Sequence, residues 1–358
     1  MVTVPAIKGT LADCIAFALN NEINWTRDAS SPWGIHEDDM PPWNRLLGPV
    51  WPRGGVSGAV VVDGERLISW GDTRRPDLTF SVAKTYLSLL CGLAFDAGLI
   101  RDVDECVVIS APDIGFESKH NQSITWRHLL QQTSEWEGSC CGVPDQVDHY
   151  RYLSFQDSCD RSHVKKGTKR RLNEPGTHWE YNDVRVNQLS LALLHLFRQP
   201  LDEVFEQRIL KPIGCSCDWE WAPYFDAFIN IDGTAMPTLP GGSHWGGGVR
   251  ISSQDQVLIG QLLLQRGRWR GEAVISEDWI DLMLAPSSLA PYYGFLTWLN
   301  TDGILFPRLP ESSVFAIGAG GSYTWMDPEL NAVTVVRWIN PSSVETFMVR
   351  LREALASR

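Results

Sequence analysis

Apolar residues recur at helical spacing in five stretches of the chain, and this periodicity predicts five amphipathic helices. They cover residues 11–20, 82–97, 184–197, 254–265 and about 342–356. Two β-rich runs, 56–62 and 65–70, flank Asp63-Gly64 and predict a hairpin, because that residue pair favours the positive φ angles of a tight turn. Residues 314–326 and 332–339 flank Asp327-Pro328 and predict a second pair of strands.

The predicted strands come from the two ends of the chain, and helices and loops fill its middle. This order predicts an α+β fold, with an antiparallel sheet built from both chain ends, flanking helices and a helical insertion domain. We expect residues 1–105 and 236–358 to form an α/β sheet domain. Residues 106–235 should form a mainly helical domain, with the active site between the two.

Composition and charge exclude several classes of partner. The chain has 358 residues and a formal charge of −12, and this acidic balance argues against a nucleic-acid ligand. No apolar run reaches the roughly 18 residues that span a bilayer, and the first residues lack the pattern of a signal peptide. We therefore expect a cytoplasmic protein that binds no membrane; its oligomeric state stays open.

The cysteine and histidine spacings predict no metal and no cofactor. The chain has eight cysteines but neither C-x-x-C nor H-E-x-x-H, so the usual zinc spacings are missing. The cysteines are expected to be reduced thiols.

The first candidate for chemistry is Ser81-Val82-Ala83-Lys84, at the start of the helix predicted over residues 82–97. Residues three apart share one helix face, so the Lys84 amine can reach the Ser81 hydroxyl. The helix N-terminus adds free backbone amides and partial positive charge. Such a hydroxyl, base and amide are what an acyl-transfer nucleophile requires.

A second copy of the spacing, Ser162 to Lys165, lies in the basic run 161–171. No apolar helix follows it, so we interpret this run as a solvated loop without a catalytic role.

Five segments in this order resemble the serine β-lactamase and penicillin-binding-protein superfamily, and most of all its class C branch with the family VIII esterases and 6-aminohexanoate-dimer hydrolases. The segments are Ser81 to Lys84, 124–134 (ITWRHLLQQTS), 174–183 (EPGTHWEYND), 248–255 (GVRISSQD) and 318–322 (GAGGS). Together these segments are specific for the fold of the superfamily, but they do not identify the substrate.

The resemblance implies that Tyr181 is the general acid/base tyrosine, although Tyr224-Phe225-Asp226 also fits the Y-x-D pattern. Asp183 stands where relatives commonly have Asn. If Asp183 is ionised near Lys84 it raises the lysine pKa, and Tyr181 then becomes the better proton acceptor from Ser81. Alternatively, Asp183 faces the substrate and selects an amide or ammonium group.

In the third motif, Ala319 occupies the position that we match to the Lys or His of many relatives. Without that cation the site loses an attraction for a substrate carboxylate, a group that β-lactams and D-Ala-D-Ala peptides carry. Arg250 could replace the charge from a neighbouring loop. We expect the backbone amides of Ser81 and Ser322 to form the oxyanion hole.

The remaining substrate-binding candidates follow the same motifs: Trp245, Gly320, Gly321 and Tyr323. Further aromatic residues, among them Trp179, Tyr292, Tyr293 and Trp325, are candidates for lining a pocket for a neutral or apolar acyl group.

The sequence thus predicts a serine hydrolase that cleaves small carboxylic esters or amides through an acyl-serine intermediate. Two alternatives stay open: a β-lactamase or D,D-peptidase, and a non-catalytic binding protein that has kept the fold.

Overall fold

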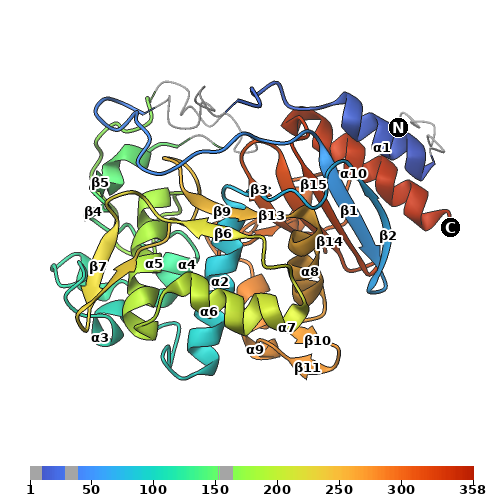
Figure 1. Cartoon of the computed structure of the whole chain (residues 1–358). Helices are drawn as coiled ribbons and strands as arrows, with labels where there is room; N and C mark the ends of the chain where they lie inside the picture. Colours follow the sequence, from blue (N-terminus) through green and yellow to red (C-terminus); the bar gives the residue numbers. More distant parts are fainter. Residues whose placement is uncertain (1–9, 29–38, 152, 154–163) are drawn as a thin grey trace.

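The main sheet combines strands from both ends of the chain, and this confirms the predicted α+β fold. Its six strands, all antiparallel to their neighbours, run in the order β12 (Trp298–Leu299), β13 (Val314–Gly318), β14 (Ser322–Asp327), β15 (Ala332–Arg337), β1 (Ser57–Val62) and β2 (Glu65–Trp70). The computed structural model describes residues 10–28, 39–151, 153 and 164–358. Figure 1 shows the sheet with its blue and red strands side by side.

The prediction of one strand over residues 314–326 is wrong, because this segment forms the hairpin of β13 and β14. Gly320 and Gly321 make the turn with φ angles of 70° and 75°, which other residues rarely adopt. A Cβ on Gly321 would lie 1.8 Å from the carbonyl oxygen of Ile339, so the turn also requires a close approach of two backbones.

Helices cover both faces of the sheet. On one face, α10 (Pro341–Ala356) places Phe347 against Trp70 at 5.8 Å between ring centroids, and α1 (Leu11–Asn20) packs beside α10. On the other face, α8 (Ser253–Leu264) crosses β1, β14 and β15, where the Ser253 and Ser57 hydroxyls lie 3.1 Å apart. These helices, together with α2 (Val82–Asp96) and α5 (Asp183–Phe197), confirm the five predicted from apolar periodicity.

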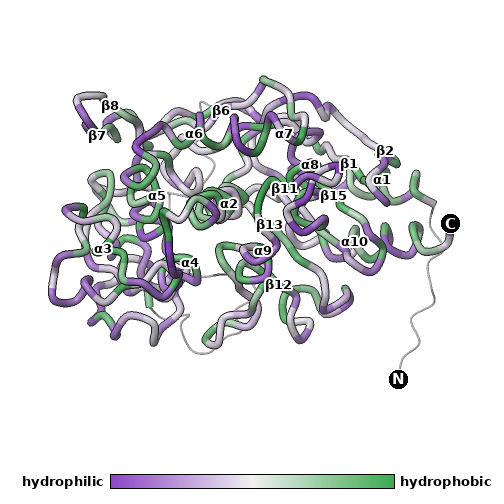
Figure 2. Tube along the Cα trace, turned by 90° about the horizontal axis from the view of Figure 1, so that it is seen from below, coloured by the Kyte–Doolittle hydropathy of each residue, from purple (hydrophilic) through white to green (hydrophobic). Residues whose placement is uncertain are grey.

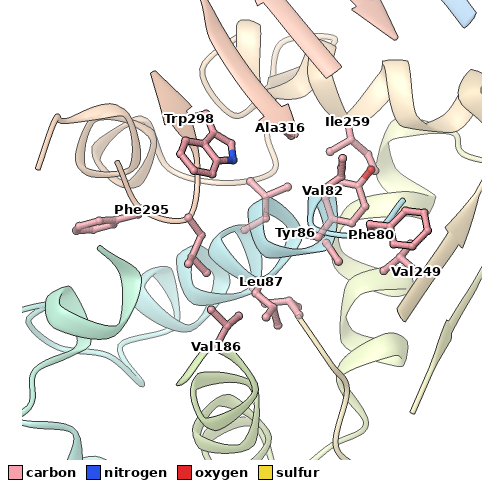
Figure 3. Close-up of a cluster of buried hydrophobic side chains, with 14 of the residues drawn as sticks. Phe80, Val82, Tyr86, Leu87, Val186, Val249, Ile259, Phe295, Trp298 and Ala316 are labelled. Carbon is pink, nitrogen blue, oxygen red and sulfur yellow. The ribbon is translucent and has the colours of Figure 1, made fainter. Parts of the chain in front are cut away.

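The helix α2 (Val82–Asp96) is buried from Val82 to Ala94 and lies at the centre of the molecule (Figure 2). Apolar side chains surround it, and Figure 3 shows Val186, Val249, Ile259, Phe295 and Ala316 among them. Because these neighbours come from the middle and from the C-terminal third of the chain, α2 joins distant parts of the core.

The remaining elements lie mainly on the side of α2 away from the large sheet (Figure 1). Between residues 106 and 237 they are α3 (Val107–Ser110), η1 (Asn121–Ser123), α4 (Trp126–Leu130), β4 (Ser139–Cys140), β5 (Val143–Pro144), η2 (Asp145–Asp148), α5 (Asp183–Phe197), α6 (Leu201–Phe205), η4 (Glu206–Leu210), α7 (Lys211–Ile213), β6 (Glu220–Ala222), β7 (Phe228–Ile231) and β8 (Thr234–Pro237). The later ones are β10 (Arg268–Trp269), β11 (Glu272–Ala273), α9 (Glu277–Leu284) and η5 (Thr301–Gly303).

A small sheet positions the start of α2. It has the order β3 (Asp77–Leu78), β9 (Gly248–Ile251), β6. The buried Arg337 of β15 donates to the carbonyl oxygens of Ile251 and Asp77 at 2.5 and 2.9 Å, so it ties β9 and β3 to the main sheet. In the described part of the chain, no helix combines the length and apolar character needed to cross a bilayer.

Candidate active site

Ser81 stands at the N-terminus of α2, directly after a sharp change of chain direction. The preceding residue, Phe80, has φ = +52°, a conformation that costs a non-glycine residue conformational energy. Its ring packs edge-on against Trp25 and Trp338, with centroids 5.8 and 6.0 Å away. This packing holds the turn that ends β3 and begins α2, and thereby fixes the direction of Ser81.

The Lys84 ammonium donates a hydrogen bond of 2.9 Å to the Ser81 hydroxyl, as the three-residue spacing predicts. The Lys84 side chain is 1% exposed, whereas Ser81 is partly open to solvent. A buried amine therefore contacts a hydroxyl that a small molecule can approach.

Tyr181 and Asp183 reach the same place from the start of α5. The chain before α5 is anchored to residue Gln132, whose carbonyl accepts from the Glu180 amide and whose side chain accepts from the Asn182 amide. The Asn182 side chain caps α5 by accepting from the amides of its first turn. The Lys84 Nζ atom lies 4.7 Å from the centroid of the Tyr181 ring.

Asp183 pairs with Lys84 through a contact of 2.5 Å between Oδ1 and Nζ. Burial would lower the pKa of Lys84, but the interactions with Asp183 and Tyr181 together outweigh burial, and the lysine pKa is raised. This is the first of the two arrangements that the sequence leaves open for Asp183. Lys84 is therefore an ammonium at neutral pH and is not poised to act as a base.

The other oxygen of Asp183 faces a residue that the sequence analysis missed. Arg151 Nη1 lies 2.9 Å from Asp183 Oδ2, and the Asp183 side chain is only 4% exposed. Burial would raise the pKa of Asp183, but Arg151 and Lys84 lower it well below its usual range. With one cation on each oxygen, Asp183 acts as a buried structural carboxylate, and a direct contact with substrate is not supported.

The backbone of Gly242 forms the neighbouring wall of the site. A Cβ at this position would lie 3.1 Å from Lys84 Nζ, 3.5 Å from Ser81 Oγ and 3.6 Å from Asp183 Oδ2. A side chain here would crowd all three groups.

The third motif contacts the two residues that precede Ser81, through Gly318. A Cβ on Gly318 would meet the Thr79 carbonyl oxygen at 2.0 Å and Phe80 Cβ at 3.3 Å. Ser322 is buried and is the cross-strand partner of Gly318. The end of β13 therefore runs next to the residue that precedes Ser81.

The other residues predicted from this motif pack against core residues. A Cβ on Gly320 would lie 2.8 Å from Trp338, and Gly321 adjoins Ile339. Tyr323 is buried in β14, where Ile317 and Val336 are its cross-strand partners.

Arg250 and Trp245 are not brought to the Ser81 hydroxyl. Arg250 lies opposite Glu220 across β9 and β6, pairs with its carboxylate at 3.1 Å and covers the ring of Trp51. Trp245 is fully buried and donates to Asp39 Oδ2 at 2.8 Å. The positive charge of Arg250 is thus paired with Glu220, and the Trp245 side chain makes a structural hydrogen bond to Asp39.

A model of the beta-lactamase family matches residues 43–342, which is most of the chain. The chain belongs to the beta-lactamase family. No curated protein sequence matches it.

Solved structures of beta-lactamase relatives share this fold at low sequence identity. A putative beta-lactamase from Bacteroides dorei superposes with a TM-score of 0.59 at 16% identity, covering 85% of this chain and 92% of that one. A putative 6-aminohexanoate-dimer hydrolase from Bacillus anthracis gives 0.58 at 13% identity, covering 97% and 94%. A family VIII carboxylesterase gives 0.57 at 15% identity, covering 84% and 93%.

An aromatic cluster surrounds Tyr181 in this beta-lactamase-family site. The Tyr181 ring stacks on Trp298 with centroids 5.4 Å apart, and Trp179 and Tyr293 lie 6.4 and 6.3 Å from it. Tyr292, which is partly exposed, contacts Trp179 at 5.4 Å. The structure therefore gathers Trp179, Tyr292 and Tyr293 as the sequence suggests and adds Trp298.

A buried network of charges extends from Asp183 away from Ser81. Asp148 Oδ2 accepts from the Asp183 amide at 2.7 Å and from Arg151 at 3.1 Å, and its Oδ1 lies 3.0 Å from Lys166 Nζ. Lys166 also pairs with Asp39. The prediction that the basic run 161–171 is a solvated loop is thus wrong for Lys166, and also for Arg170, which is largely buried and pairs with Glu135 and Glu180; residues 161–163 lie outside the described part.

The same network contains one group of possible metal ligands. Among the described residues, ligand atoms of Asp39, Asp148 and His244 all lie within 4.8 Å of one another. Lys166 Nζ contacts all three, with 3.1 Å to His244 Nε2. The lysine ammonium therefore neutralises these carboxylates in the place of a metal cation.

Sequence reasoning missed Arg151, Asp148 and Lys166 because nothing in their spacing distinguishes them from surface charges. One available signal was Asp183 itself. A buried carboxylate is stable only when it is paired and its remaining oxygen lone pairs are hydrogen-bonded, so Asp183 needs partners beyond Lys84.

A second buried cluster, around Glu135, leads to a prediction about acid stability. Glu135 is fully buried and pairs with Arg170 at 2.5 Å and Arg185 at 2.9 Å. Burial would raise its pKa, but the two arginines lower it from the ordinary 4.5 to about 2. Because the folded pKa is the lower one, the stabilisation is complete above pH 4.5 and is lost as the pH falls toward 2.

We expect Glu135→Gln to be less stable at neutral pH and to lack this acid dependence, which is worth on the order of 3 kcal/mol. Urea unfolding at a series of pH values measures it. The exposed Glu137→Gln is the matched control and should follow the wild type. Parallel pH dependences of Glu135→Gln and wild type would contradict the prediction.

Proposed function

We propose that the protein is a serine hydrolase that cleaves small, neutral carboxylic esters or amides through an acyl-serine intermediate. The observation that carries the proposal is the convergence of Lys84 on both the Ser81 hydroxyl, at 2.9 Å, and the Tyr181 ring, at 4.7 Å. Membership of the beta-lactamase family supports it, as do esterases and amidohydrolases among the structures with this fold.

In the proposed reaction the Ser81 oxygen attacks the substrate carbonyl carbon while its proton passes to the Tyr181 oxygen. Because Lys84 is held as an ammonium by Asp183, it stabilises the negative charge on Tyr181 and does not take the proton itself. Tyr181 then protonates the leaving alcohol or amine. Water attacks the acyl-serine with the same tyrosine as base, and the acid is released.

The oxyanion that forms during attack needs two backbone amides. We assign them to Ser81, at the N-terminus of α2, and to the β13–β14 hairpin, where Ser322 is the predicted donor. Because Gly318 abuts Thr79 and Phe80, the amide of Ala319 at the end of β13 is a second candidate for that donor.

The decisive experiment is covalent labelling of the wild-type protein with a fluorophosphonate, followed by peptide mass spectrometry. We expect one adduct, on Ser81. An adduct on another residue, or none, would contradict the serine-hydrolase proposal, and a protein that shows none would fit the alternative of a binding protein with this fold.

A neutral acyl group is favoured because Arg250 is already paired with Glu220. We expect kcat/KM for p-nitrophenyl butyrate to exceed that for the p-nitrophenyl ester of succinate, which differs chiefly in its free carboxylate. A charge-assisted pair between an enzyme cation and a substrate carboxylate is worth about 1.5–3 kcal/mol. Without such a pair, we expect the two kcat/KM values to differ by about 10- to 150-fold.

The Arg250→Ala variant is the control for this preference and should leave the ratio of the two kcat/KM values unchanged. Equal turnover of both esters, or turnover of a cephalosporin reporter that Arg250→Ala abolishes, would instead favour the β-lactamase or D,D-peptidase alternative.

A further inference from the structure

Arg151 occupies a position between the candidate catalytic groups and the buried charge network. Its Nη1 atom lies 2.9 Å from Asp183 Oδ2 and 3.1 Å from Asp148 Oδ2, and its side chain is 15% exposed. The guanidinium carbon lies 5.3 Å from the centroid of the Tyr181 ring. One arginine thus contacts the partner of Lys84 and the ring of the proposed base.

Two further side chains, Asp148 and His244, hold Arg151 in place. Asp148 comes from η2, and its second oxygen is neutralised by Lys166 at 3.0 Å. His244, in the loop before β9, accepts a hydrogen bond of 3.2 Å from Arg151 through Nδ1. Because Nδ1 is the acceptor, Nε2 carries the proton and donates to Asp39 at 2.9 Å.

The neutral state of His244 completes this arrangement. Burial lowers the pKa of His244, and the positive charge of Arg151 lowers it further. The charged groups around Tyr181 and Asp183 are therefore Lys84 on α2, Arg151 and Asp148 at η2, and Lys166 and Asp39 beyond them. Lys84 and Arg151 are the two whose positive ends lie over the Tyr181 ring.

We propose that Arg151 is a positioning residue for proton transfer: it holds Asp183 against Lys84 and provides a second positive charge that favours the ionised form of Tyr181. This inference rests on the proposed serine-hydrolase function and adds to it a role for a residue outside the matched motifs. The negative charge of Asp183 offsets part of the positive charge of Lys84. The guanidinium of Arg151 adds a second positive charge near the Tyr181 side chain and compensates for this loss.

A purely structural role for Arg151 predicts a different result. If the arginine only stabilises the fold, its removal lowers activity by the same factor at every pH. If it favours the phenolate, its removal shifts the acid limb of the pH profile to higher pH, and activity recovers at high pH. An opposite charge at this range typically shifts an ionisation by about one to three pH units.

The test compares Arg151→Gln, which keeps hydrogen-bond donors but loses the charge, with Arg151→Lys, which keeps the charge. The readout is the second-order rate constant for fluorophosphonate labelling of Ser81 as a function of pH. We expect the acid limb of Arg151→Gln to move up by about one unit or more, and that of Arg151→Lys to stay near the wild type. Thermal unfolding confirms that each variant is folded.

Two further variants keep the result decisive. Arg170→Gln is the matched control, because Arg170 is also a buried arginine but pairs with Glu135 and Glu180; its acid limb should not move. If Arg151→Gln fails to fold, Asp148→Asn/Arg151→Gln removes both members of a buried pair together and should show the same shift.

An unshifted profile, or an equal shift in Arg170→Gln, overturns the role of Arg151 and leaves the serine-hydrolase proposal intact. A wild-type protein that is not labelled overturns that proposal first, and the role of Arg151 with it.

Discussion

Ser81→Ala is expected to lower kcat/KM for p-nitrophenyl butyrate by about 10⁴-fold or more and to abolish fluorophosphonate labelling. The substitution removes the only atom that forms the covalent bond, so neither Lys84 nor Tyr181 retains a function in the chemical step. The fold should be unaffected, because the Ser81 side chain makes no capping hydrogen bond to α2. Activity assays and thermal unfolding of the purified variant measure both quantities.

Ser162→Ala is the matched control, since Ser162 begins the other Ser-x-x-Lys sequence of this chain. It lies outside the described residues, and its replacement should leave activity unchanged. If Ser81→Ala kept wild-type turnover and labelling, the proposed nucleophile would be wrong.

Tyr181→Phe is expected to lower kcat about 10²- to 10⁴-fold, the usual contribution of a general acid or base. The loss is attributed to proton transfer because phenylalanine preserves the ring, which stacks on Trp298 at 5.4 Å. The melting temperature should therefore change little. Steady-state kinetics with an ester substrate and a thermal melt separate the two effects.

Tyr224→Phe tests the specificity of this result, because Tyr224 belongs to the other Y-x-D sequence. Its hydroxyl accepts a hydrogen bond of 3.4 Å from Asn187, and the pKa of this buried tyrosine is raised. We expect nearly full activity. A larger loss in Tyr224→Phe than in Tyr181→Phe would move the general base to the second motif.

Local sequence features were sufficient to predict the centre of the site. The contact between Lys84 and Ser81 follows from a three-residue spacing on one helix, and a helix periodicity is readable without tertiary information. Tyr181 was predicted from a motif in a fixed order, and the structure places it beside Lys84.

Features that depend on tertiary packing were not predictable in the same way. The charges of Arg151 and Lys166 are buried by contacts with Asp148 and Asp183. The local sequence of a polar loop does not indicate such burial. Arg250 lies within one of the matched segments, but its position on β9 directs its charge to the cross-strand partner Glu220. The β13–β14 turn was missed because Gly320 and Gly321 interrupt an otherwise continuous β-rich run.

The pairing of β1 with β15 has a consequence for synthesis on the ribosome. Ser81 and its helix emerge before β13, which adjoins Phe80, and before β15, which pairs with β1. Contacts this distant in sequence form late and slowly. The nascent protein must therefore keep its central helix covered, or bound to a chaperone, until β13 and β15 have been made.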